Sequence, residues 1–235
     1  MNQHIIQNNL LEIKDRIARA ARRAGRKPEE IKIVAVTKTH PADVVLLAYR
    51  AGLWIFGENR IQEATPKIET LSEYPEITWH LIGHLQSNKA RKAVEYFDLI
   101  QAVDSAELAE RLAGIGREKE QKIPILLEVN VSREATKYGL SPQDLSPVLD
   151  KIASLPEIEI QGLMTIGPLA GTDMQIHRAF AELRKIFEKT AAIVAERRRF
   201  DILSMGMTDD FEIAIEEGAN MIRIGRGIFG ERAPI

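Results

Sequence analysis

Short apolar runs alternate with amphipathic stretches along almost the whole chain. The runs are rich in Val, Ile and Leu, which is typical of parallel strands buried on both faces. Each run is followed by a stretch with apolar residues near helical spacing, or by a helical turn. The runs predict eight strands, over residues 33–37, 54–56, 78–82, 99–103, 125–131, 158–166, 202–205 and 221–224.

The stretches around these runs predict helices with recognisable start and stop residues. Ser141 is expected to cap a helix with Pro142 as its first residue, and Thr208 to cap the helix that ends at Gly218. The expected helices are 7–24, 41–52, a third that ends near 71, 88–96, one that ends near Gly114 or Gly116, 141–155, 174–198 and 208–218, with a short turn at 228–229.

Regular alternation of strands and helices implies a parallel sheet. Eight units in about 200 residues fit a closed (β/α)₈ barrel. An open doubly wound sheet usually has fewer strands and a G-x-G-x-x-G motif after the first, which is absent here. We therefore predict one modified TIM barrel domain over residues 1–235, with an extra helix before the first strand.

Composition narrows the function classes. The formal charge of −2 gives no overall attraction to nucleic acid or to an acidic membrane, and the basic clusters at 89–92 and 197–199 fit solvated helix faces. The absence of cysteine excludes disulfides, thiol catalysis and thiolate metal sites. No secretory leader or 18-residue apolar run is visible. The expectation is a soluble cytoplasmic protein.

The first predicted strand delivers Lys38. This lysine shares its parity with Val34 and Val36, so it is expected to point to the same side of the sheet. Burial at that position disfavours the ammonium and lowers the lysine pKa, which produces an amine suited to a Schiff base with a carbonyl compound. The alternative is a lysine at a strand end with its ammonium in water.

Chemistry in such barrels lies at the carboxyl ends of the strands, and the loops after strands seven and eight commonly hold phosphate. His80 is either a functional residue or a core histidine, and Asn59 either contacts a ligand or caps the next helix. His40 and His84 show no metal-ligand spacing, so no metal site is expected. The residues at predicted strand ends are Lys38, Asn59, His80, Lys137, Met164, Thr165, 204–207 and 223–227.

Residues 204–207 and 223–227 predict a phosphate-binding site. Gly206 and Gly225 let the backbone approach an anion near helix starts, Ser204 offers a hydroxyl, and Arg223 offers a bidentate guanidinium. Each glycine alone could merely turn the chain, but both loops together favour binding. A phosphate site that faces a desolvated lysine indicates a phosphorylated carbonyl compound, with pyridoxal 5′-phosphate as the obvious candidate.

Several short stretches of the chain match the motifs of a known family. They are Ala35-Val36-Thr37-Lys38, Phe56-Gly57-Glu58-Asn59, Trp79-His80-Leu81-Ile82-Gly83, Gly162-Leu163-Met164-Thr165-Ile166, Leu203-Ser204-Met205-Gly206-Met207-Thr208-Asp209-Asp210, Arg223-Ile224-Gly225 and Ile228-Phe229-Gly230. These stretches span nearly the whole chain in the family's order. By them the chain resembles the pyridoxal phosphate homeostasis family, known as alanine racemase N-terminal-like or proline synthetase co-transcribed proteins.

The resemblance implies a barrel of the fold-type III kind, with the cofactor as an aldimine on Lys38 and no attached β-domain. Lys137 matches a second family lysine near the site. Arg226 and Gly227 stand where the family often has Ser or Thr, so backbone N–H groups are the contacts expected to remain there. The implied cofactor residues are Lys38, Asn59, His80, Met164, Ser204, Gly206, Arg223, Gly225 and Arg226.

The resemblance also implies a carrier that serves intracellular homeostasis and delivery of pyridoxal phosphate. The competing class is a racemase-like enzyme, which needs a second acid/base opposite the lysine. In the related racemases that group is a tyrosine of a C-terminal β-domain; this chain ends five residues after Gly230, and only Tyr138 lies in a strand-end loop. We expect a monomer that is not an enzyme and that passes the cofactor to apo-enzymes. A barrel enzyme that uses a Schiff-base lysine on another phosphate ester is the third alternative.

Overall fold

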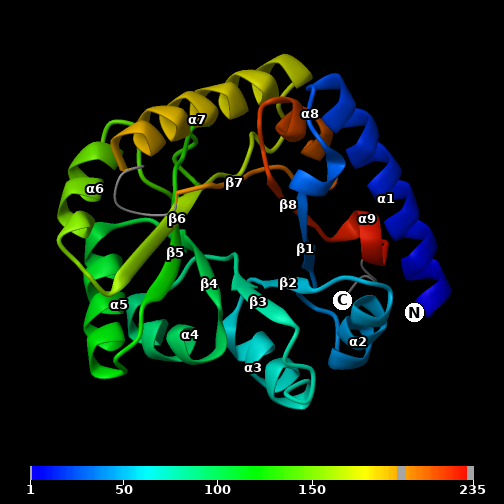
Figure 1. Ribbon diagram of the computed structural model, residues 1–235, viewed down its shortest axis with the longest axis horizontal. Coiled ribbons are helices and arrows are strands. Elements are labelled where there is room, and N and C mark those ends of the chain that lie inside the picture. The colour runs from blue at the N-terminus through cyan, green and yellow to red at the C-terminus, as the bar shows by residue number, and fades with distance from the viewer. Residues whose placement is uncertain (1, 195–199, 232–235) are drawn as a thin grey trace.

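The computed structural model describes residues 2–194 and 200–231, and its centre is a closed barrel of parallel strands in chain order (Figure 1). The last strand pairs with the first, which closes the ring and confirms the predicted fold. The strands are β1 (Lys32–Val36), β2 (Ile55–Glu58), β3 (Thr78–Leu81), β4 (Leu99–Val103), β5 (Ile123–Glu128), β6 (Ile158–Met164), β7 (Ile202–Ser204) and β8 (Met221–Ile224).

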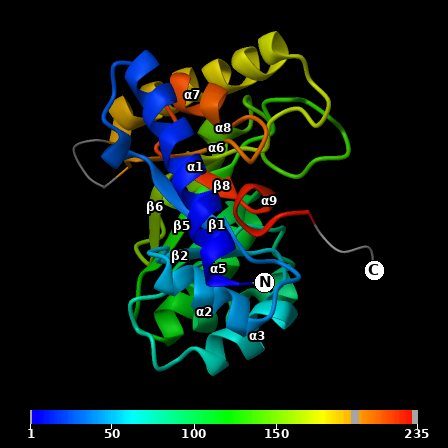
Figure 2. The same cartoon turned by 90° about the vertical axis from the view of Figure 1, so that its right-hand side faces the viewer.

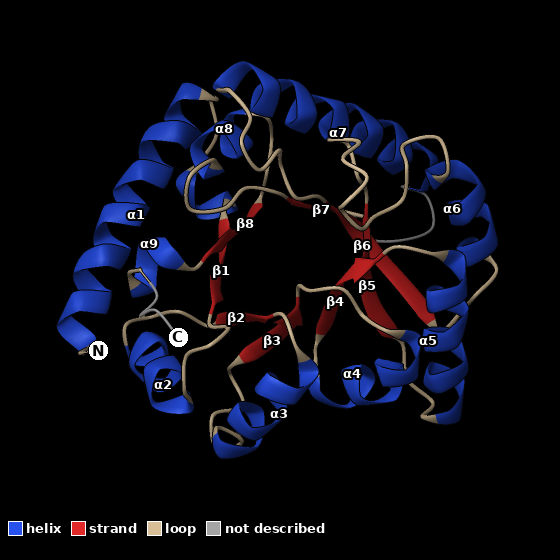
Figure 3. Cartoon of the chain, turned by 180° about the vertical axis from the view of Figure 1, so that it is seen from behind, coloured by secondary structure: helices blue, strands red, loops and turns tan. Residues whose placement is uncertain are grey.

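Helices surround the barrel on its outer side (Figure 3). The first, α1, packs against the helices at both ends of the alternation and lies across the outside of the β8–β1 junction (Figure 2). The helices are α1 (Gln3–Arg23), η1 (Pro28–Glu30), α2 (Ala42–Arg50), α3 (Ile61–Thr70), η2 (Ser87–Lys89), α4 (Ala90–Tyr96), α5 (Ala106–Glu118), α6 (Leu145–Ala153), α7 (Asp173–Val194), α8 (Phe211–Glu216) and α9 (Arg226–Phe229).

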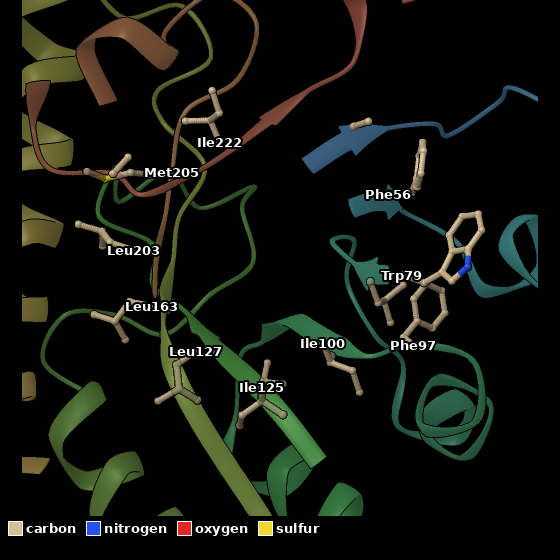
Figure 4. Packing of buried hydrophobic residues seen from close by; sticks show 14 of the residues in the cluster. Phe56, Trp79, Phe97, Ile100, Ile125, Leu127, Leu163, Leu203, Met205 and Ile222 are labelled. Carbon is tan, nitrogen blue, oxygen red and sulfur yellow. The ribbon is translucent and has the colours of Figure 1, made fainter. Parts of the chain in front are cut away.

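The strand side chains form two apolar layers. One layer lies between the strands and the helices, with side chains such as Phe56, Ile100 and Leu127 that point outward (Figure 4). The other fills the barrel and consists of Val34, Leu99, Ala102, Leu126, Met164, Ile202 and Met221. Because successive strand residues alternate between these layers, each strand presents a defined set of side chains to the barrel interior.

The predicted end of α5 and the predicted start of α6 are wrong. α5 passes through both glycines to Glu118, because Gly116 serves a close approach: a Cβ there would lie 2.9 Å from the Gln121 carbonyl oxygen. α6 begins at Leu145, not at Ser141. The Ser141 hydroxyl accepts a hydrogen bond from the Asp144 amide (3.2 Å) in a separate turn before the helix.

The end of the long helix predicted over 174–198 and the basic cluster at 197–199 lie outside the described residues. In the other basic cluster, Arg91 and Lys92 are exposed on α4, as expected for a solvated face. Within residues 2–194 and 200–231, no helix combines the length and the apolar composition that crossing a membrane requires.

Candidate functional site

A pocket of about 560 Å³ opens at the carboxyl ends of the strands. Hollows of 420 to 560 Å³ also occur elsewhere, so volume alone does not single it out. Its lining does, because cationic side chains converge there with residues from the carboxyl ends of six strands, β1, β2, β3, β6, β7 and β8. The lining residues are Val36, Lys38, His40, Asn59, Ile82, Ile166, Leu169, Met207, Thr208, Asp209, Arg223, Gly225, Arg226, Gly230 and Glu231.

Lys38 lies in a tight turn just beyond β1. The His40 amide donates to the Thr37 carbonyl oxygen at 3.0 Å, which closes the turn around Lys38 and Thr39. Lys38 is half-buried and lines the pocket together with Val36, while Val34 belongs to the apolar layer inside the barrel. The parity argument for Lys38 therefore holds.

Arg223 is the buried cation of the pocket. It projects inward from β8 with 4 % exposure, and its Nη1 and Nη2 donate to Ser204 Oγ (2.8 Å) and to the Thr165 carbonyl oxygen (2.7 Å). Burial lowers the pKa of the guanidinium to about 10, although Asp210 and Glu128 counteract the shift. Arg223 therefore stays protonated at neutral pH.

A chain of buried hydrogen bonds runs across the barrel below the pocket. Ser204 Oγ donates to Gln101 Oε1 (2.7 Å), and Gln101 Nε2 donates to His80 Nδ1 (2.8 Å). Burial lowers the pKa of His80 to about 3, so the ring is neutral and carries its proton on Nε2. His80 and Ser204 are thus joined to Arg223 but are not among the residues that line the pocket.

The other predicted site residues divide between the pocket and the core. Asn59 lines the pocket, and the N-cap of α3 is Arg60, so the alternative role of Asn59 as that cap is wrong. Met164 is fully buried in the layer inside the barrel. Gly206 has φ +94°, and a Cβ there would lie 2.6 Å from the Ala214 Cβ, so this glycine permits close packing of α8.

The loops after β7 and β8 meet at the pocket. Thr208 does not cap α8, whose N-cap is Asp210; instead its Oγ1 accepts from the Gly227 amide (3.3 Å) and joins the two loops. Gly225 is the N-cap of α9. Arg226 also lines the pocket and forms ion pairs with Asp209 and Glu231.

Lys137 lies outside the pocket lining and is held firmly. Its Nζ donates to Glu134 Oε1 (2.7 Å), to the Gly167 carbonyl oxygen (2.7 Å) and to Ser132 Oγ (3.3 Å). The next residue, Tyr138, stacks on His84 with ring centroids 3.8 Å apart. Lys137 thus ties the loop after β5 to the loop after β6.

Two functional candidates were missed from the sequence. Gln101 is a polar residue within the apolar strand β4, and Glu128 is an acidic residue at the end of the apolar strand β5. Glu128 is 4 % exposed, and burial raises its pKa to about 7; Arg223 opposes that shift and Asp104 adds to it. A polar residue at an inward position of an apolar strand was the available signal for both.

Glu128→Gln is expected to make the free energy of unfolding less dependent on pH. The pKa of Glu128 rises from 4.5 to about 7 on folding, so the folded protein binds this proton more tightly than the unfolded chain. The stability that this group contributes is complete below pH 4.5 and is lost as the pH rises to 7, by about 3 kcal/mol at most.

Urea unfolding at pH 5 and pH 8, without cofactor, measures the difference between the two proteins. The variant is expected to lose less stability than the wild type between these pH values. Glu107→Gln, on the exposed face of α5, is the matched control and should follow the wild type. Parallel losses in wild type and Glu128→Gln would contradict the assignment of this proton to Glu128.

The pocket residues fit a phosphorylated aldehyde. Lys38 supplies an amine, Arg223 a buried guanidinium, and the first turn of α9 at Gly225 supplies N–H groups that a helix does not use internally. Asn59 adds a neutral hydrogen-bonding side chain. Such a set can bind an anion at one end of a ligand and an aldehyde elsewhere on it.

Comparison with known proteins agrees with this chemistry. A model of the alanine racemase N-terminal domain matches residues 9–233. The pyridoxal phosphate homeostasis protein of Pseudomonas aeruginosa is 40% identical over 227 residues, which cover 97% of this chain and 96% of that protein. PipY of Synechococcus elongatus PCC7942, solved with pyridoxal phosphate bound, is 39% identical with a TM-score of 0.84, over 96% of this chain and all of PipY.

An alanine racemase of Clostridium difficile shares the fold at greater distance. It is 16% identical with a TM-score of 0.76, and the match covers all of this chain and 58% of the racemase. At that identity the likeness concerns the barrel alone.

Proposed function

The chain belongs to the family of the alanine racemase N-terminal domain, with pyridoxal phosphate homeostasis proteins as relatives along nearly its whole length, and we propose that it binds pyridoxal 5′-phosphate and serves its homeostasis. The observation that carries the proposal is the convergence of Lys38 and Arg223 on one pocket at the carboxyl end of the barrel. The bound cofactor in PipY supports the choice of ligand.

Each pocket residue has a proposed task. Lys38 would hold the cofactor through its Nζ, which would condense with the aldehyde carbon and release the carbonyl oxygen as water, and the N–H groups at Gly225 and Arg226 would hold the phosphate together with Arg223. Ser204 and His80 act on the cofactor indirectly, through Arg223. Ser204 bonds to Arg223, and His80 is connected to Ser204 through Gln101. When bound, pyridoxal phosphate supplies a reactive aldehyde that amines of other molecules can capture.

We further propose that the protein carries the cofactor and does not itself catalyse amino-acid chemistry. The name of the relatives supports this choice, as does the position of Tyr138, which stacks on His84 and is not among the residues that line the pocket. His40 does line the pocket, and imidazole side chains commonly act as general acids or bases. The proposed setting is the cytoplasm, the proposed state a monomer, and the proposed recipients are apo-enzymes.

Exchange of the Cα proton distinguishes a carrier from an enzyme. The loaded protein is incubated with L- and D-amino acids in deuterated water, and a racemase-like enzyme would exchange that proton rapidly. A carrier is expected to give exchange no faster than free pyridoxal phosphate at equal concentration. It is also expected to restore the activity of an apo-enzyme that is mixed with it.

Exchange that is orders of magnitude faster than with free cofactor, and that Lys38→Ala abolishes, would contradict the carrier proposal. The variant His40→Gln then tests whether His40 takes part in that exchange. If His40 is the second acid/base, this variant loses the exchange while it still binds cofactor.

A further inference from the structure

A buried ion pair lies on the outer side of the barrel directly behind the Lys38 turn. Lys67 reaches from α3 and donates to Glu58 Oε1 (2.7 Å) and to the Thr37 carbonyl oxygen (2.8 Å). The Thr37 hydroxyl donates to the same carboxylate oxygen at 2.6 Å. Glu58 and Thr37 have no exposed surface, and Lys67 has 7 %.

This cluster of Glu58, Lys67 and Thr37 is not expected to add much to the stability of the fold. Burial raises the pKa of Glu58 even though Lys67 and Thr37 both oppose the shift, so desolvation of the carboxylate outweighs its two contacts. Glu58 Oε2 is also buried and has no hydrogen-bond partner among the described residues. A buried pair of this kind often contributes no more stability than apolar side chains of similar size.

The cluster does fix the hydroxyl and the carbonyl oxygen of Thr37, the residue before Lys38. Thr37 also donates its amide to the Gly57 carbonyl oxygen at 3.1 Å, so three contacts anchor it to β2 and α3. Its carbonyl oxygen accepts from both Lys67 Nζ and the His40 amide, which is the bond that closes the Lys38 turn.

The turn itself is strained. Thr39 has φ +70°, a left-handed conformation that a β-branched residue rarely adopts and that costs free energy. Such a conformation persists only where the surroundings impose it. The contacts that fix Thr37 hold one side of this turn, and on the other side the His40 ring lies against Phe229 with ring centroids 4.9 Å apart.

We propose that Lys67 and Glu58 are positioning residues for Lys38. By holding Thr37 through its carbonyl oxygen and its hydroxyl, they impose the turn that directs the Lys38 amine into the pocket. Neither residue is among those that line the pocket. The inference rests on the proposed function, in which Lys38 bonds to the aldehyde of pyridoxal phosphate.

The double variant Lys67→Met/Glu58→Met replaces the ion pair with apolar side chains of similar length. Two ligands are titrated against it: pyridoxal 5′-phosphate, which bonds to Lys38, and pyridoxine 5′-phosphate, which has the ring and phosphate but no aldehyde. We expect the affinity for pyridoxal phosphate, followed by visible absorbance, to fall about 10-fold, as for loss of one charge-assisted hydrogen bond. Affinity for pyridoxine phosphate should change less than 2-fold.

Arg16→Met is the matched control, since it removes a partly buried ion pair with Glu212 between α1 and α8, and neither residue lines the pocket. It should leave both affinities unchanged, whatever its effect on thermal unfolding. Should the double variant not fold, Thr37→Val removes only the hydroxyl contact with Glu58 and is expected to act in the same direction, about 3-fold.

Equal loss of affinity for both ligands would overturn the proposal, because it would mean a general loosening of the barrel. No loss for either ligand would overturn it as well. A wild-type protein that develops no visible band with pyridoxal phosphate would instead refute the proposed function itself, so the two failures are distinguishable.

Discussion

Lys38→Ala is expected to abolish the visible absorbance that the protein develops with pyridoxal phosphate. That absorbance requires a covalent bond between an amine and the aldehyde carbon, and the proposed amine is the Lys38 Nζ in the pocket. Titration at micromolar cofactor is expected to show the band in the wild type and no band in the variant. The phosphate contacts are left intact, so pyridoxine phosphate should still bind to the variant.

Lys137→Ala is the matched control for this experiment. Lys137 is the second lysine expected near the site, but its Nζ is bound by Glu134, Ser132 and the Gly167 carbonyl. This variant should keep the band. Its effect should be limited to loosening the loops after β5 and β6, which Lys137 joins by hydrogen bonds. Loss of the band in Lys137→Ala and its retention in Lys38→Ala would reverse the assignment.

Arg223→Ala is expected to weaken binding of pyridoxal phosphate by about 10- to 150-fold. A charge-assisted hydrogen bond contributes roughly 1.5–3 kcal/mol, and each 1.4 kcal/mol corresponds to a factor of ten. Pyridoxal, which lacks the phosphate, should bind to the variant nearly as well as to the wild type. The ratio of the two affinities is therefore the quantity to measure.

The same variant is expected to unfold more easily. Arg223 donates to Ser204 Oγ and to the Thr165 carbonyl oxygen, and its removal leaves buried acceptors unpaired at about 1–3 kcal/mol each. Thermal unfolding without ligand measures this loss separately. Equal weakening of pyridoxal and pyridoxal phosphate would mean that Arg223 acts on the ring or on the fold and does not bind the phosphate.

The barrel could be predicted because apolar runs and amphipathic stretches alternate without interruption, and each residue period points to one element type. Parity along β1 was enough to place Lys38 beside Val36 in the pocket. Helix ends were less predictable where a glycine could either end the helix or allow another part of the chain to pack closely against it. Gly114 and Gly116 read as stop signals, but α5 continues because the missing Cβ of Gly116 lets it approach the chain at Gln121.

Contacts between distant strands could not be predicted in the same way. His80, Gln101, Ser204 and Arg223 come from β3, β4, β7 and β8, and they meet only because the stagger of the barrel brings them to one height. The predicted roles of His80 and Ser204 as direct contacts of the cofactor remain predictions. In the structure neither residue lines the pocket, and both are connected by hydrogen bonds to Arg223, which does.

The Glu58–Lys67 pair escaped prediction for a related reason. Glu58 stands next to Asn59, which lines the pocket, but alternation turns the Glu58 side chain outward to α3. Lys67, within an ordinary amphipathic helix, carries no sequence signal of burial. Only the packing of α3 against β2 brings its ammonium to the Thr37 carbonyl oxygen.

Reduction with borohydride tests the central assignment most directly. The protein is loaded with pyridoxal phosphate, reduced so that the bond to its amine becomes permanent, digested and mapped by mass spectrometry. The account predicts that one peptide carries the added mass and that the modified residue is Lys38. Modification of Lys137 with Lys38 left unmodified, or no modification at any lysine, would contradict it.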